Sequence, residues 1–108
     1  MMERQWPHTP LARALLCIGY LREDADDELI EPEYPGNLVV AQAEADVYNL
    51  MLQAVAIEQE YGGTIASARE RTVQLQQEHL ENARGANAAY RQGIKKAYRS
   101  VLVNLDNA

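Results

Sequence analysis

The sequence is poor in the residues and patterns on which several protein classes depend. It contains a single cysteine, Cys17, so an internal disulfide is excluded and a reducing compartment is expected. Its N-terminus lacks the basic, apolar and small-residue regions of a signal peptide. No apolar run reaches the roughly twenty residues that a membrane-spanning helix needs. We therefore expect a soluble cytoplasmic protein.

Residues that would support catalysis or metal binding are also scarce. Neither His8 nor His79 has a histidine or glutamate at the spacing that places two metal ligands on one helical face. The Gly62-Gly63-Thr64 step lacks the longer glycine pattern and the lysine of a phosphate-binding loop. We therefore predict that the protein is not an enzyme and has no catalytic residue, metal site or cofactor. His79 falls on an apolar stripe, so we expect a hydrogen-bonded histidine in the core or in an interface.

What the chain does contain is typical of a folded domain. Hydrophobic residues make up 47% and charged residues 24% of its 108 residues, which predicts one globular domain spanning 1–108. Residues 1–60 carry three basic and twelve acidic side chains, a charge of -9, whereas residues 61–108 carry seven basic and four acidic ones, a charge of +3. This asymmetry favours protein partners and ordered contacts between copies. The acidic total makes nucleic acid an unlikely partner.

The N-terminal third predicts one helix and one acidic loop. Thr9 as N-cap and Pro10 at the first helical position predict a helix over 10–22, which is apolar around most of its circumference. Residues 23–33 then carry seven acidic side chains and no basic one, and prolines and a glycine follow. Because a block of like charges repels itself and proline interrupts a helix, 23–36 is expected to be an exposed loop.

The middle of the chain predicts a buried helix. Asn37 is a candidate N-cap, and the Gly62-Gly63 pair is a strong helix stop. Between them, residues 38–61 carry two apolar stripes, with the charged residues confined to the remainder. A helix with two apolar stripes packs between two partners, so this segment is expected to be the central element.

The last forty residues predict one long helix over 64–104, capped by Thr64. An apolar stripe runs from Ile65 to Leu105 in eleven steps, about 3.6 residues per step, which is the period of a straight α-helix. The stripe passes Gly85 without losing phase. We therefore predict an all-α fold of three helices, with a break near Gly85 and a four-helix bundle as the alternative.

A continuous third helix would need a partner outside its own chain. It would be about 60 Å long, whereas the central helix would span only about 36 Å. Tyr90, Ile94, Tyr98 and Val101 would then be uncovered unless a second chain met them, which predicts a homo-oligomer. A break at Gly85 would let the chain close into a compact bundle and remove this need.

Two charged segments are candidate partner-binding sites. The basic residues near the C-terminus are interleaved with tyrosines, a pattern found on solvated helix faces, in protein interfaces and, less often, in clamps for single-stranded nucleic acid. The acidic run has no glycine at the position that a Ca²⁺-binding loop requires. The predicted partner-binding residues are Arg84, Tyr90, Arg91, Ile94, Lys95, Tyr98, Arg99 and Val101 together with Asp24, Asp26, Asp27 and Glu28.

Two short segments carry a family resemblance. Residues 11–21 read LARALLCIGYL, and after the acidic linker residues 43–52 read AEADVYNLML. They resemble the start of the head-to-tail adaptor, or tail accessory, proteins of short-tailed phages, whose first helix reads roughly A-L-x-x-I/L-G-V-L and whose next helix contains A-L-x-x-L-N-x-M-L. The resemblance covers about residues 11–62. It implies a helical subunit, repeated in a ring beneath the portal, that contacts the portal and the next tail component and has no enzyme activity.

These patterns lead to two hypotheses about function. The first is a structural or assembly protein that acts through protein contacts, such as a phage head-to-tail connector subunit. The alternative is a small acidic inhibitor or anti-defence protein, which would use the acidic run as a phosphate mimic to block a nucleic-acid-binding partner.

Overall fold

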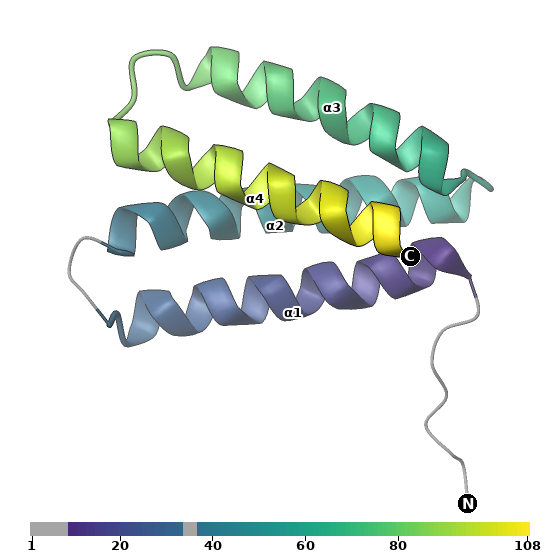
Figure 1. Ribbon diagram of the computed structural model, residues 1–108, viewed down its shortest axis with the longest axis horizontal. Coiled ribbons are helices and arrows are strands. Elements are labelled where there is room, and N and C mark those ends of the chain that lie inside the picture. Colours follow the sequence, from purple (N-terminus) through teal and green to yellow (C-terminus); the bar gives the residue numbers. More distant parts are fainter. Residues whose placement is uncertain (1–8, 34–36) are drawn as a thin grey trace, which may run out of the picture.

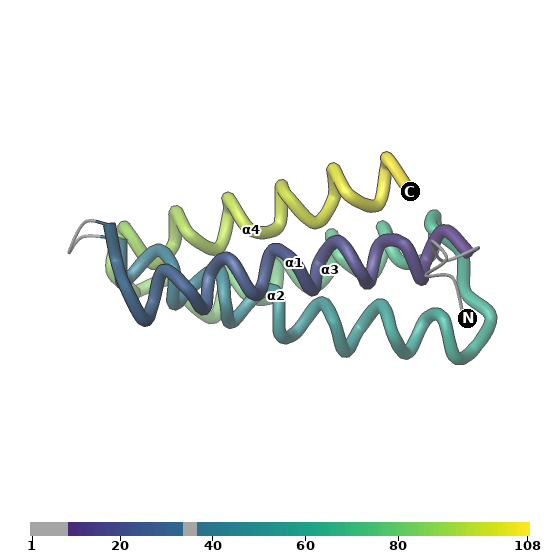
Figure 2. The backbone as a smooth tube through the Cα atoms, turned by 90° about the horizontal axis from the view of Figure 1, so that it is seen from below, coloured from purple at the N-terminus to yellow at the C-terminus, as the bar shows by residue number. Residues whose placement is uncertain are grey.

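The computed structural model describes residues 9–33 and 37–108, and this part of the chain is all-α. Its four helices are α1 (Pro10–Ile30), α2 (Asn37–Glu60), α3 (Ile65–Asn82) and α4 (Ala88–Asn107), and they run alternately in opposite directions (Figure 1). The paired helices α2 and α4 occupy the middle, with α1 packed on one flank and α3 on the other. Seen from below, α4 and α2 lie on opposite sides of α1, so α1 covers the seam between them (Figure 2).

Helix α1 begins as predicted but continues eight residues further. Thr9 caps it by accepting a hydrogen bond from the Ala12 N–H at 3.2 Å, and Pro10 opens its first turn. The prediction that 23–36 is wholly a loop is wrong, because Glu23–Ile30 is helical. Leu21, Ala25 and Leu29 continue the apolar spacing of Ile18 and pack into the core, which outweighs the repulsion among the carboxylates. The end of that predicted loop, 34–36, lies outside the described residues.

Helix α2 is the central element, as predicted. Its fully buried residues include Val47, Met51 and Val55, which contact the helices on either side. The helix ends before Gly62, whose φ of 77° is the left-handed conformation that glycine adopts readily. Thr64 then caps α3 through a reciprocal pair of hydrogen bonds with Ser67.

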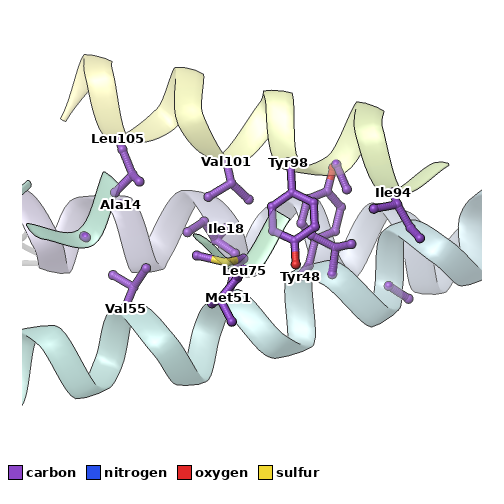
Figure 3. Packing of buried hydrophobic residues seen from close by; sticks show 14 of the residues in the cluster. Ala14, Ile18, Tyr48, Met51, Val55, Leu75, Ile94, Tyr98, Val101 and Leu105 are labelled. Atoms are coloured by element: carbon purple, nitrogen blue, oxygen red, sulfur yellow. The ribbon is translucent and has the colours of Figure 1, made fainter. Parts of the chain in front are cut away.

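The prediction of one continuous helix over 64–104 is wrong, and the alternative of a break near Gly85 is confirmed. Helix α3 ends at Asn82, and α4 begins at Ala88 after Asn87 accepts a hydrogen bond from the Ala89 N–H at 2.7 Å. Folding back places α4 against α1 and α2, where its apolar face is buried (Figure 3). The burial of several large apolar side chains outweighs the interruption of one helix.

This folding back also removes the argument that α4 needs a second chain. Ile94, Tyr98 and Val101 are each 0% exposed within the single chain. Helices α1, α2 and α3 of the same chain cover these side chains, so their predicted contact with a partner stays a prediction without support from exposure. No helix in the described ranges is long and apolar enough to cross a membrane.

Candidate functional site

The largest concentration of charge lies where the C-terminal half of α1 faces the start of α2. We define the acidic surface as Asp24, Asp27, Glu28 and Glu31, on α1 and just beyond its end, together with Glu44 of α2. These residues line two adjoining hollows, of about 270 Å³ and about 460 Å³, which share Asp24 and Glu28. Because a helix rather than a loop carries most of them, the backbone positions that carry these carboxylates are fixed relative to one another.

Two carboxylates of the acidic surface are held by specific contacts. Glu28 Oε1 accepts hydrogen bonds from the Glu33 N–H at 2.9 Å and from Asn37 Nδ2 at 3.1 Å. The Glu33 bond first, then the Asn37 bond, lowers the pKa of Glu28, so this carboxylate stays ionised at neutral pH. Glu44 Oε1 lies 3.3 Å from Nζ of Lys96, which reaches across from α4.

The acidic surface retains a strong negative charge after these contacts. Lys96 is the one basic side chain among the residues that line the two hollows, against five carboxylates. Asp26, although predicted with the others, lies away from this surface and pairs with Arg22 at 3.6 Å. A surface of this kind attracts a cationic partner and repels polyanions.

The predicted basic site is dispersed by the fold. Arg84 lies in the turn between α3 and α4 and pairs with Glu81 at 2.8 Å, and Arg91 is partly buried with an Nε that has no hydrogen-bond partner in the described structure. Lys95 and Arg99 are exposed on the outer face of α4, and no ion pair is recorded for them within the described ranges. Two basic side chains, Lys95 and Arg99, are therefore available to a partner, instead of a continuous basic cluster.

The tyrosines of the predicted basic site point into the bundle. Tyr90 donates a hydrogen bond to Asp46 Oδ2 at 2.5 Å, and Tyr98 is fully buried with its hydroxyl 3.1 Å from Nδ1 of His79. The Tyr98 and His79 rings also meet edge to face, with centroids 5.8 Å apart. Neither tyrosine ring is therefore paired with the basic residues in the way that stacking on nucleic-acid bases would require.

The sequence predicted only part of the acidic surface and only part of the contacts that Tyr90 and Tyr98 make. The predicted acidic site does not include Glu31, which lies just beyond the end of α1, and Glu44 and Lys96 meet only because α2 and α4 pack together, which no local pattern indicates. The pairing of Asp46 with Tyr90 is also a tertiary contact, although Asp46 on a mostly apolar helix was a signal. His79 makes the expected hydrogen bond, which joins it to Tyr98, and its side chain is partly buried.

The pKa values of Tyr90, Tyr98 and His79 follow from burial and pairing. The hydrogen bond to Asp46, helped by partial burial, raises the pKa of Tyr90 to about 12, and burial raises the pKa of Tyr98 to about 12. Burial lowers the pKa of His79, an effect that the negative charge of Asp46 opposes. Both tyrosines are therefore neutral, and His79 is neutral at pH 7.

His79 makes the stability of the bundle depend on pH. Its pKa is lower in the folded chain than the value of about 6.5 in the unfolded chain, so the unfolded chain binds more protons as the pH falls below that value. The stabilisation is complete above pH 6.5 and is lost as the pH falls toward the folded pKa. We expect the free energy of unfolding to fall by up to about 1.4 kcal/mol per pH unit in that window.

Urea unfolding at pH 7.5 and at pH 5.5 measures this effect, with His79→Gln as the control that cannot titrate. The wild-type chain should lose more stability than the variant between the two pH values. A parallel loss in both proteins would show that His79 is not responsible.

Among the described residues, no group of three or more histidine, cysteine, aspartate or glutamate side chains could hold a metal ion. The acidic surface is thus arranged as a broad charged face around two shallow hollows.

No family model, curated protein or solved structure matches this chain.

Proposed function

We propose that the protein is a non-enzymatic binding protein whose acidic surface docks on a basic surface of another protein. The observation that carries this proposal is the placement of five carboxylates from α1, its end and α2 around two adjoining hollows, with Lys96 as the one basic residue that lines them. An ordered backbone loses less conformational entropy on binding than a loop does, so an acidic helix is a better recognition element than an acidic loop.

The partner that fits this surface best is a protein that binds nucleic acid. Asp24, Asp27 and Glu31 follow one another on one side of α1, with steps of about 4.5 Å and about 6 Å along the axis. Successive phosphates of a DNA strand advance about 3.4 Å, so a cleft that accepts a phosphate backbone meets here a sparser row of negative charges with spacing of the same order. The protein would then act as an acidic inhibitor that competes with nucleic acid.

A matched pair of variants tests the role of this surface. Asp24→Asn, Asp27→Asn and Glu31→Gln together remove three charges from the acidic surface, and Glu60→Gln, Glu70→Gln and Glu78→Gln remove three exposed charges elsewhere. Binding of a short arginine-rich peptide is measured by calorimetry at physiological salt. We expect about a tenfold loss of affinity for the first variant, since three exposed ion pairs contribute about 0.5 kcal/mol each.

The second variant should bind the peptide almost as well as the wild-type chain. Equal losses in the two variants would mean that only net charge matters, and the proposal of a specific surface would fail. Circular dichroism confirms that both variants keep their helix content.

A second candidate function is that of an assembly subunit, such as a phage head-to-tail connector. The observation that favours it is the exposed pair Lys95 and Arg99 on α4, which could meet the acidic surface of the next copy. Calorimetry at low salt without the peptide tests this candidate. The wild-type chain should self-associate, and the variant that lacks the charges of Asp24, Asp27 and Glu31 should not. If the wild-type chain stays a monomer under those conditions, the connector function loses its support.

A further inference from the structure

The turn between α3 and α4 joins two helices whose apolar stripes are in phase. The stripe on α3 includes Ala68, Thr72 and Leu75, which are buried, and the stripe on α4 includes Val101 and Leu105, which are buried as well. With about 3.6 residues per step, both stripes belong to one helical face if 83–87 is also helical. The closed fold does not need this agreement, because a turn separates its two helices.

The turn itself contains little that opposes a continuous helix. Only Gly62 has a positive φ among the described residues, so Gly85 is not in a conformation that requires glycine. The Ala83 N–H donates to the His79 carbonyl at 3.0 Å, which is a helical bond, and the Ala86 N–H donates to the Ala83 carbonyl at 2.9 Å. Asn87, with φ -52° and ψ 139°, departs from helical geometry mainly in ψ.

The residues around the turn are small although the closed fold does not crowd them. A Cβ built on Gly85 would meet nothing within 4 Å, and Ala86 and Ala88 are exposed. By contrast, Gly93 is small because α2 passes close to it. Small side chains at 83–89 would have a use if two helices passed each other closely at this point.

From these observations we propose that two copies of this chain exchange α4 by straightening the turn at 83–87. Residues 65–107 then form one helix in each copy, and α4 of one copy packs on α1, α2 and α3 of the other. Every contact that buries Ile94, Tyr98 and Val101 is remade between copies, so the exchange sacrifices only the contacts of the turn. The two long helices run antiparallel and cross near Gly85, where the small residues lie.

Two sets of turn substitutions shift the exchange in opposite directions. Gly85→Ala with Asn87→Ala raises helix propensity and removes the N-cap of α4, so it favours the straight form. Ala88→Pro favours the closed form, because the extended Asn87 suits a residue before proline and position 88 is the first of the helix. In a continuous helix, the new proline ring would clash with the carbonyl of Arg84.

The experiment refolds each protein from denaturant at high concentration and measures mass by light scattering after gel filtration in high salt. We expect a dimer fraction in the wild-type chain and a monomer for Ala88→Pro. Because each dimer straightens two turns and both substitutions act on each of them, the association constant of the Gly85→Ala and Asn87→Ala variant should rise roughly a thousandfold. High salt removes charge-driven association through the acidic surface, so the outcome is independent of the proposed function.

Cross-linking then identifies which chains are in contact. Arg69 Nε and Asp106 Oδ1 lie 3.0 Å apart between α3 and α4. Arg69→Cys and Asp106→Cys, in a Cys17→Ser background, are joined with a short bis-maleimide. In an exchanged dimer the link connects two chains, whereas in the closed fold it lies within one. A dimer fraction whose links are all within one chain, dimers of the Ala88→Pro variant, or monomers of the Gly85→Ala and Asn87→Ala variant would each overturn the proposal.

Discussion

Replacing Tyr98 with alanine should lower the free energy of unfolding by about 3–5 kcal/mol, the range found for large buried aromatic side chains. The Tyr98 side chain is 0% exposed and lies between α4 and the central core residues (Figure 3). Its removal leaves a cavity and also deprives His79 of its hydrogen-bond partner at 3.1 Å. Since a domain of this size has a total stability of about 5–15 kcal/mol, this loss is a large fraction of the total. Urea unfolding followed by circular dichroism measures the loss.

Two control substitutions divide this effect into its parts. Tyr98→Phe keeps the ring and removes only the hydroxyl, so its loss should be about 0.5–1.5 kcal/mol. Val103→Ala changes a side chain on the same helix that is 51% exposed, and its effect should stay within about 0.5 kcal/mol. If Tyr98→Ala were as mild as Val103→Ala, α4 would not be packed in the way described.

The parts of the fold that sequence predicts well are those fixed by local interactions. The caps at Thr9 and Thr64 and the stop at Gly62 each depend on hydrogen bonds or backbone angles within a few residues. They were predicted at the correct positions because the side chains that make them are near in the sequence. The two-striped central helix was also predicted, since its pattern requires packing on two sides whatever the partners are.

The break between α3 and α4 could not be decided from sequence, because both forms satisfy the same pattern. An in-phase stripe through Gly85 is compatible with one long helix and with a hairpin of two helices. The choice depends on whether Ile94, Tyr98 and Val101 find a groove in their own chain, and that groove exists only after α1 and α2 have packed together. The extension of α1 through Glu23–Ile30 was missed for a related reason, since tertiary burial of Ala25 and Leu29 outweighs the local charge repulsion.

The candidate site was predicted in part. Asp24, Asp27 and Glu28 were recognised from their charge alone, which does not depend on the fold. Glu44 and Lys96 complete the surface from other helices, and their meeting at 3.3 Å is a consequence of the packing of α2 against α4. The basic residues were grouped too broadly, because Arg84 lies in the turn before α4 and Arg91 is partly buried, which leaves Lys95 and Arg99 exposed on one side of the helix.

The same substitution at two glycines should change stability in opposite directions. A Cβ built on Gly93 of α4 would lie 2.7 Å from the Ala43 Cβ and 2.8 Å from the Val40 carbonyl oxygen of α2. These atoms belong to a helix backbone and to a side chain with no freedom to move, so Gly93→Ala should force α2 and α4 apart. Overpacking of about 1–3 kcal/mol, set against a gain of about 1 kcal/mol in helix propensity, gives an expected net loss of up to about 2 kcal/mol.

Gly19, in the middle of α1, is the matched control for this prediction. A Cβ there would meet nothing within 4 Å, so Gly19→Ala adds helix propensity without a clash and should stabilise the chain by about 0.5–1 kcal/mol. Urea unfolding of both variants at pH 7.5 gives the two free-energy changes directly. If Gly93→Ala stabilised the chain as Gly19→Ala does, α2 and α4 would have to be further apart than the close approach at Gly93 allows, and the central helix pair described above would be wrong.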